Sequence, residues 1–345
     1  MNLRTPLTEL TGCTYPIVQT AMGYVATPEL VAASCNAGAL GFLAAATLTP
    51  EQADEAIART KQLVGGRPFG VNFLSEQPGV EEVVDAIIRH GVRVASYSRA
   101  PRADLIGRLK SAGVLCMPTV GAVRHAVRAV EFGADIIVAQ GAEGGGHTGS
   151  IPTSLLLPAV IEAVNVPVVG AGGFHDGRGL AAALAMGAAG IAMGTRFLLT
   201  AESPVPLATK QRYLQAGLDD TVVTRKIDGL PHRVIRNTLV DQLDRASGPR
   251  LLAISLRNAR TYARASGFQA RDALKLMRSQ GIVQSLMLAN APAMIQRAMV
   301  DGDPEHGALP SGQVAGVITD LPTCAELVQR IVSGAEAASP VITVQ

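Results

Sequence analysis

Two glycine-rich stretches form the pattern in this chain that points most directly to chemistry. The first spans residues 139–149, the second spans residues 170–179, and a shorter Gly-x-x-x-Gly run follows at 190–194. Each comes directly after, or contains, a short apolar run that is typical of a buried parallel strand. Glycine lets backbone N–H groups approach an anion closely, and a following helix adds the positive end of its dipole. The pattern therefore predicts a phosphate-bearing ligand.

His147 lies within the first glycine-rich stretch, where no apolar neighbour would bury it. A histidine in such a setting has little structural use, so we expect a functional role for it beside the ligand. Asp176 directly precedes an expected helix and is interpreted as its N-cap. His125 is expected on a helix surface, and a structural role is favoured for Glu143.

The elements that must position these residues alternate regularly over about the first 200 residues. Several expected helices begin with capping chemistry, as at Thr27-Pro28 and Thr49-Pro50, and several end at a glycine such as Gly91. Eight strand–helix units are typical of a (β/α)8 TIM barrel, whereas a doubly wound sheet shares only the early part of the pattern. The expected strands are Pro16–Gln19, Leu40–Leu43, Phe69–Asn72, Val92–Ser96, Leu115–Thr119, Asp135–Ala139, Pro167–Gly170 and Gly190–Met193.

On such a barrel the candidate residues share one location. Met22 follows the first strand, Asn72 ends the third and Thr119 ends the fifth. The stretch from Gln140 to Gly149 follows the sixth strand, and the other two glycine runs follow the seventh and eighth. Barrel enzymes build their sites at the carboxyl ends of the strands, with phosphate bound after strands seven and eight.

Residues 205–300 break this rhythm, because they lack strand alternation and are predicted to be helical. We interpret them as a helical cap inserted in a barrel made of residues 1–204 and 301–345. The insertion holds 15 Lys and Arg against 6 Asp and no Glu, a charge of +9 in a chain of net charge +2. This charge fits either an anionic ligand or a solvated helical surface.

Composition excludes several classes of function. With 48% hydrophobic and 17% charged residues, the chain suits a compact α/β enzyme. Few aromatic residues and no recognised module argue against nucleic-acid binding. No apolar run approaches the roughly 18 residues of a membrane span, and the first residues lack a signal-peptide core. The four cysteines are widely spaced, which favours reduced thiols in a cytoplasmic protein, and no metal-ligand cluster is expected.

The motifs together resemble the nitronate monooxygenase family, also called 2-nitropropane dioxygenases. The resemblance covers nearly the whole chain and is weakest over 205–300. It implies a barrel that binds FMN, the group that would carry the redox chemistry, for which the side chains offer no substitute. The motifs that carry it are Pro16–Gln19 with Met22, Arg67–Asn72, Ala139–Gly149, Ala171–Leu180, Met193–Leu198 and Ser311–Ile318.

Carried over by position, the resemblance implies roles for individual residues. Met22 and Asn72 would lie against the isoalloxazine, and Gln140 and Gly145 would line its edge. Thr119 stands near the flavin where many family members have a lysine, which removes a cation. The FMN phosphate would be bound by backbone amides of Gly172, Gly173, Gly194 and Thr195.

The same resemblance places two residues toward the substrate. His147 would face the substrate over the flavin, either as a general base for an acidic carbon or to polarise the substrate's oxygens. Ser311 would lie near both the flavin and the substrate. Tyr24, which follows the first strand, is expected to border the substrate.

The family match favours oxidation of a nitronate or nitroalkane with oxygen. The alternative is an FMN-dependent dehydrogenase or enoyl reductase acting on a coenzyme A thioester, from a steroid-ring or lipid pathway. Two features support this alternative: the absence of the family lysine at Thr119, and the basic insertion. In the insertion, Arg225, Lys226 and Arg233 would bind the anionic part of the substrate. Two further hypotheses are a non-catalytic flavin sensor and a purine-nucleotide dehydrogenase. The electron acceptor stays open, and a homodimer is the expected assembly.

Overall fold

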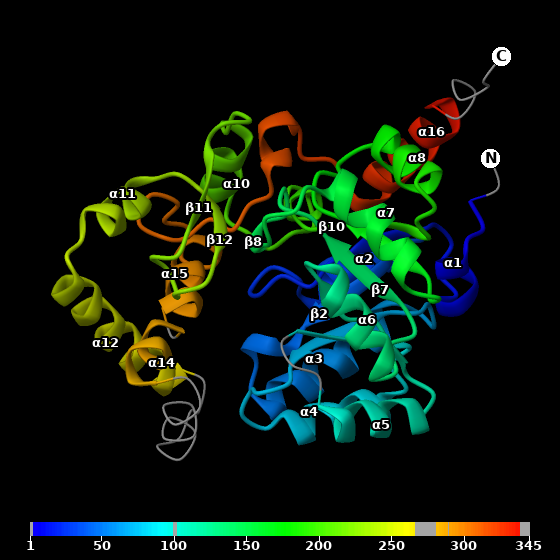
Figure 1. The fold of residues 1–345 in the computed structure, drawn as a ribbon, viewed down its shortest axis with the longest axis horizontal. Helices are drawn as coiled ribbons and strands as arrows, with labels where there is room; N and C mark the ends of the chain where they lie inside the picture. The colour runs from blue at the N-terminus through cyan, green and yellow to red at the C-terminus, as the bar shows by residue number, and fades with distance from the viewer. Residues whose placement is uncertain (1–2, 99–101, 266–280, 289, 339–345) are drawn as a thin grey trace.

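The computed structural model describes residues 3–98, 102–265, 281–288 and 290–338. Its centre, seen in Figure 1, is one sheet of short parallel strands. The strands follow the order β5-β4-β3-β2-β1-β10-β9-β7-β6. The strands match the predicted runs one by one, with shifts of one to a few residues at their ends. They are β1 (Ile17–Gln19), β2 (Leu40–Ala44), β3 (Gly70–Leu74), β4 (Val94–Ser98), β5 (Leu115–Cys116), β6 (Thr119–Val120), β7 (Ile137–Gln140), β9 (Val168–Ala171) and β10 (Gly190–Met193).

The two strands at the ends of this order are halves of one run, and they close the barrel. Strand β5 pairs with β4 on one side, whereas β6 pairs with β7 on the other. Only Met117 and Pro118 separate them, and hydrogen bonding continues there: Met117 N donates to Ala95 O (2.8 Å), and Val138 N donates to Pro118 O (2.9 Å). The predicted TIM barrel of eight strand segments is therefore confirmed.

Helices surround the barrel, and the last of them returns to it from the end of the chain. In Figure 1, α16 lies beside α8, and the two backbones touch because a Cβ on Gly177 would come within 2.4 Å of Ala335 N. The surrounding helices are α1 (Pro6–Thr11), α2 (Pro28–Asn36), α3 (Pro50–Leu63), α4 (Val80–His90), α5 (Ala103–Ser111), α6 (Val123–Glu131), α7 (Thr153–Ala163), α8 (Gly177–Ala185), α9 (Thr195–Leu198) and α16 (Cys324–Ala338), with 3-10 turns at Ala45–Thr47 and Gln313–Val317.

Local sequence explains where these helices begin. Thr49 Oγ1 accepts the Gln52 amide at 3.3 Å to cap α3, and Asp176 accepts the Gly179 amide at 3.0 Å to cap α8. An N-cap satisfies one of the amides that a first turn leaves without a partner. The N-cap predicted at Asp176 is confirmed.

The barrel interior is filled by side chains that alternate along the strands. Val18, Phe42, Val94 and Val138 belong to one buried cluster inside the barrel. A Cβ on Gly70 would lie 2.3 Å from the Phe42 ring, so Gly70 makes room for this aromatic residue. The barrel is thus a packed support whose free space lies at its carboxyl end.

Residues 205–300 contain strands as well as helices, so the expectation of a purely helical segment is wrong. Strands β11 (Thr221–Thr224) and β12 (His232–Ile235) pair antiparallel, and β12 also pairs with β8 (Gly146–His147) from the barrel's loop. Residues 266–280 and 289 of this segment lie outside the described residues. Its helices are α10 (Leu207–Leu214), α11 (Thr238–Arg245), α12 (Gly248–Ala265), α14 (Ile282–Leu288) and α15 (Asn290–Met299).

This segment has a small core of its own, in which Ile227, Val234, Val240 and Leu243 are buried together with Ala291. In Figure 1, α11, α12 and α14 lie beyond β11 and β12, away from the barrel helices. We refer to β11, β12 and the intervening residues 225–231 as the hairpin. Among the described residues, none of the helices is long and apolar enough to cross a membrane.

Candidate active site

A cavity of about 830 Å³ lies at the carboxyl ends of the barrel strands. Its walls come from the barrel loops, from β12 and from α15, so the barrel and residues 205–300 both contribute. This volume falls in the range of small-molecule and cofactor sites. The predicted site residues that line it are Met22, Tyr24, Asn72, Thr119, Gln140, Gly145, His147, Gly172, Gly173, Gly194 and Thr195.

The side of the cavity formed by β9 and β10 presents main chain rather than side chains. Gly172 and Gly173 follow β9 with φ of 88° and 85°, a region that other residues rarely adopt. A Cβ on Gly172 would lie 3.0 Å from the Gly144 amide, so the two glycine loops approach each other too closely for a side chain. Together with Gly194 and Thr195 after β10, they leave a wall of peptide groups.

This wall fits the phosphate end of a nucleotide cofactor. Peptide N–H groups without intervening side chains are the usual means of binding a phosphate. Asn72 and Gln140 line the same cavity with neutral polar groups, while Met22 supplies an apolar surface. These residue types suit a planar ring that has both polar edges and apolar faces.

The loop after β7 is held in place by its own side chains. Glu143 accepts hydrogen bonds from the Thr153 amide (2.9 Å) and hydroxyl (2.8 Å) at the start of α7. Gln140 Nε2 donates to the carbonyl of His147 at 2.9 Å. The structural role favoured for Glu143 agrees with these contacts, and they fix the backbone that carries His147.

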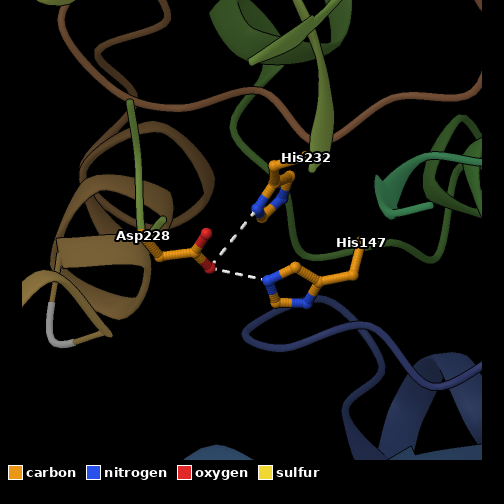
Figure 2. Close-up of side chains that lie close together, drawn as sticks. All are labelled: His147, Asp228 and His232. Atoms are coloured by element: carbon orange, nitrogen blue, oxygen red, sulfur yellow. Dashed lines mark hydrogen bonds and ion pairs between the residues drawn. The ribbon is translucent and has the colours of Figure 1, made fainter. Parts of the chain in front are cut away.

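His147 does not stand alone: its ring meets two residues of the hairpin. Its Nε2 lies 2.6 Å from Oδ2 of Asp228, and its ring centroid lies 4.7 Å from that of His232 (Figure 2). The His147 side chain is 51% exposed, whereas those of Asp228 and His232 are 2% and 3% exposed. An accessible imidazole is thus backed by a buried carboxylate.

Burial and the neighbouring imidazoles act in opposite directions on Asp228. Burial disfavours its charged form, but the interactions with His147 and His232 outweigh this and hold the pKa of the carboxyl well below its usual range. Burial also lowers the pKa of His232. At neutral pH Asp228 is therefore ionised, and His232 is neutral.

The three side chains offer donor atoms that a first-row metal accepts, namely two imidazole nitrogens and a carboxylate oxygen. Two atoms that bind one such ion at about 2.1 Å lie about 3 Å or more apart. The 2.6 Å between His147 Nε2 and Asp228 Oδ2 is instead a hydrogen-bond distance, and His232 Nδ1 lies 3.7 Å from the same oxygen. The cluster as it stands is a hydrogen-bonded pair with a neighbouring ring.

Four predicted residues do not line the cavity. Ser311 is fully buried, and its hydroxyl donates to the carbonyl of Gly312 at 3.0 Å. The guanidinium of Arg233 donates to Ala142 O and Thr221 Oγ1, both at 3.0 Å, so it ties the hairpin to the loop after β7. Arg225 and Lys226 lie in the hairpin turn, directly before the buried Ile227 and Asp228.

The side of the cavity formed by α15 is apolar. Ala291, Pro292, Ile295 and Met299 line it there, and Leu198 and Val314 extend this surface toward the barrel. Tyr24 lies at the cavity with φ of 65°, a strained conformation for a residue with a side chain. The cavity thus has a polar main-chain side and an apolar side, with His147 exposed between the loops that form it.

Sequence reasoning missed Asp228, His232 and the α15 residues. The turn signal Asp228-Gly229 and the short β-prone runs on either side could have indicated the hairpin. Arg124 and His125 also line the cavity from the first turn of α6, so His125 lies on a helix surface as expected, but at the site. No local signal indicated that α15 would cover a barrel mouth.

Comparison with known proteins gives one family and several full-length relatives. The model of the nitronate monooxygenase family matches residues 4–334. A protein of Mycobacterium tuberculosis, (3aS,4S,5R,7aS)-5-hydroxy-7a-methyl-1-oxo-octahydro-1H-indene-4-carboxyl-CoA dehydrogenase, is 52% identical over 96% of both chains. A dehydrogenase of the same name from Rhodococcus jostii is 49% identical over 97% of this chain and 96% of its own. The nitroalkane oxidase structure from Streptomyces ansochromogenes has a TM-score of 0.77 at 31% identity, covering 98% of this chain and all (100%) of that one.

Proposed function

The chain belongs to the nitronate monooxygenase family of oxidoreductases, and from that premise we propose that it is an FMN-dependent dehydrogenase of a hydroxylated alicyclic coenzyme A thioester. The observation that carries the proposal is the composition of the cavity. A main-chain wall suited to a phosphate, an apolar wall from α15 and a buried carboxylate behind His147 meet in one space. Each matches one part of such a reaction.

FMN would be held at the main-chain wall. Its phosphate would accept hydrogen bonds from the backbone amides of Gly172, Gly173, Gly194 and Thr195. Met22, Asn72, Thr119, Gln140 and Gly145 line the space in which its ring system would lie. When bound, the flavin supplies a two-electron acceptor for the hydride of a carbinol carbon, a chemistry that protein side chains lack.

The protein's own residues would handle the proton and the substrate. His147, half exposed at the cavity, would take the proton of the substrate hydroxyl. The apolar surface of α15 would receive the ring system and exclude water from it. Tyr24 borders the same space and would contact the substrate there.

The coenzyme A part is supported by the two full-length relatives and by the charge of residues 205–300. Two dehydrogenases named for a carboxyl-CoA substrate align over nearly the whole chain at 52% and 49% identity. Arg225 and Lys226 remain proposed contacts for the anionic part of the thioester. Arg233 is a weaker candidate, because its guanidinium is already bonded to Ala142 and Thr221. Ser311 would not contact the substrate. Its hydroxyl would instead hold the carbonyl of Gly312, whose main chain lines the cavity.

Oxidation of a nitronate is the second candidate. The family model over residues 4–334 and the nitroalkane oxidase neighbour at 31% identity favour it. The half-exposed His147 would equally suit an acidic carbon. A small nitronate, however, has no ring system that would contact the apolar side of the cavity formed by α15.

Anaerobic reduction of the flavin-loaded protein distinguishes the two candidates. A hydroxylated bicyclic carboxyl-CoA thioester, its free acid and ethylnitronate would be mixed in turn while the absorbance of oxidised flavin is followed. We expect fast bleaching by the thioester and at least about 100-fold slower bleaching by the free acid, since about 3 kcal/mol of binding energy comes from the CoA part. Bleaching by ethylnitronate alone would establish the second candidate and overturn the first.

A further inference from the structure

Asp228 is a buried ionised group whose part in the proposed reaction has not been described so far. Asp228 is nearly inaccessible, and its Oδ1 accepts the Leu230 amide at 3.1 Å. Its Oδ2 faces His147 across the boundary between the hairpin and the barrel loop. An ionised carboxylate without water needs strong hydrogen-bond donors, so its placement beside His147 calls for an explanation.

The protonation state of Asp228 decides which nitrogen of His147 carries hydrogen. An ionised carboxylate only accepts hydrogen bonds, so the 2.6 Å contact requires that Nε2 of His147 be the donor. A neutral imidazole that is protonated at Nε2 has an unprotonated Nδ1. In Figure 2, Nδ1 of His147 points away from both Asp228 and His232.

We propose that Asp228 is the positioning residue of this site: its carboxylate holds the Nε2–H of His147 and leaves Nδ1 as the atom that accepts the substrate's proton. The inference rests on the proposed function for the identity of that proton, which belongs to the hydroxyl group. The alcohol would lose this proton to Nδ1 and become a ketone, with bound flavin supplying the acceptor for its hydride. The imidazolium formed is stabilised by the charge of Asp228.

His232 contributes by staying neutral. It lies 3.7 Å from the same Asp228 oxygen, and neither of its ring nitrogens has a hydrogen-bond partner among the residues described. A charged ring there would compete with His147 for the carboxylate. Burial lowers the pKa of His232, and the shorter contact of Asp228, 2.6 Å against 3.7 Å, is the one to His147.

The hairpin fixes this geometry before any substrate binds. In the β12–β8 ladder His232 is paired with His147, and the Thr148 amide donates to the carbonyl of Pro231 at 3.2 Å. Ile227, the residue before Asp228, is fully buried in the core of residues 205–300. Both partners are therefore tied to the same ladder, which is the preorganisation that a proton acceptor requires.

The test compares Asp228→Asn with His147→Ala and with a matched control, Asp135→Asn. Asp135 also pairs with a cation and accepts a backbone amide, but it does so beside Lys110 and Cys116 at the amino end of β7, away from the cavity. An asparagine at 228 can donate its amide to Nε2 and so favours hydrogen on Nδ1. We expect kcat for the thioester to fall about 10²- to 10⁴-fold, with KM changed less than about threefold. Asp135→Asn is expected to keep kcat within about twofold.

A second measurement reads the tautomer without any turnover. Nitrogen-15 NMR of ring-labelled protein, with the His147 signals identified by their loss in His147→Ala, reports which ring nitrogen is protonated. We expect a protonated Nε2 and an unprotonated Nδ1 in the wild-type protein, with the populations shifted in Asp228→Asn. This result without turnover of any thioester would support the role of Asp228 and overturn only the proposed substrate.

Three results would overturn the inference. The first is an unchanged kcat in folded Asp228→Asn, and the second is a wild-type His147 protonated at Nδ1. The third is about one equivalent of a transition metal in untagged protein that is lost in His147→Ala, Asp228→Asn and His232→Gln alike. Should Asp228→Asn fail to fold, the wild-type spectrum and metal content still decide.

Discussion

The two sides of the cavity are built from different materials. On the side of β9 and β10, the barrel offers peptide groups from Gly172, Gly173 and their neighbours, and the Glu143 carboxylate that lies beside Gly173 is bonded to Thr153. On the side of the hairpin, the working groups are side chains, and Asp228 and His232 are almost fully buried. The first surface depends on the absence of side chains and the second depends on their exact identity.

The main-chain side suits binding that many proteins share, whereas the side-chain side suits one reaction. A main-chain wall binds a phosphate whatever molecule carries it, so it suits a cofactor shared by a whole family. A buried carboxylate, a neutral imidazole and an apolar helix suit one reaction on one kind of substrate. We therefore expect substitutions on the two sides to fail in different ways.

The largest effect is expected from a side chain placed on the main-chain side. Gly172→Val would force a β-branched residue to φ of 88° and bring Cβ to 3.0 Å from the Gly144 amide. Strain of about 1–3 kcal/mol and the displaced loop should reduce FMN affinity at least about tenfold. The measurement is flavin binding to the apoprotein by fluorescence quenching.

Its control is Gly187→Val, which meets the same backbone strain at φ of 90° but lies at the end of α8, outside the cavity lining. This variant should lose stability and keep its FMN affinity. Equal loss of FMN affinity in both variants would show that the main-chain wall has no special part in binding the cofactor.

An intermediate effect is expected on the apolar side. Ile295→Ala on α15 removes a side chain that lines the cavity. Losing about 1–2 kcal/mol of apolar contact should raise KM for a bicyclic thioester about 5- to 30-fold, with KM for acetyl-sized hydroxyacyl thioesters unchanged. Steady-state kinetics of both substrates give the answer. Leu256→Ala, at an exposed position of α12, serves as control.

If Ile295→Ala raised KM for both thioesters equally, α15 would not be the surface that recognises the ring system. The specific part of the site would then have to lie nearer Tyr24 and Met22. After such a result, the His147–Asp228 pair would be the remaining functional feature on the hairpin side of the cavity.

The smallest effect concerns stability and pH. Because burial lowers the pKa of His232, the unfolded chain binds a proton that the folded chain rejects. Stability from this group is complete above the unfolded pKa of about 6.5 and is lost as pH falls toward the folded value, by at most about 1.4 kcal/mol per pH unit. Asp228, whose pKa is lowered, acts in the same direction only below about pH 4.

Urea unfolding of wild type and His232→Phe between pH 7.5 and pH 5 checks this sign. The slope of unfolding free energy against pH should be shallower in His232→Phe. His147 and Asp228, the ionisable groups that face this ring, remain in both proteins. A steeper slope in the variant would contradict a neutral, buried His232.

Local sequence patterns predict the barrel because its strands and loops are built locally. Each strand is a short apolar run with its own turn residues, and the glycines that form the main-chain wall directly follow their strands. Thr49 and Asp176 could be assigned as caps from their immediate neighbours. The eight-unit rhythm then places these loops at one end of the barrel.

The hairpin side could not be predicted in this way. The four-residue strands β11 and β12 are too short to show a clear period, so the segment showed no strand alternation and was predicted to be helical. Asp228 meets His147 across 81 positions of sequence, a pairing that no local pattern indicates. Arg233 looked like a ligand for anions and instead bonds to the carbonyl of Ala142.

The three-strand ladder of β8, β12 and β11 also has a consequence for how the protein comes apart. The loop that carries His147 leaves the barrel, yet its two-residue strand is paired with β12, more than 80 positions later, where His147 lies opposite His232. Closing so long a loop is slow and entropically costly, and a short ladder at the edge of a small core opens at lower free energy than the barrel does. On mild denaturation, hydrogen exchange should reach the β12 amides before those of β9 and β10. A partly open state would then keep its cofactor and lose its proton acceptor, so that activity reports on the ladder well before the barrel unfolds.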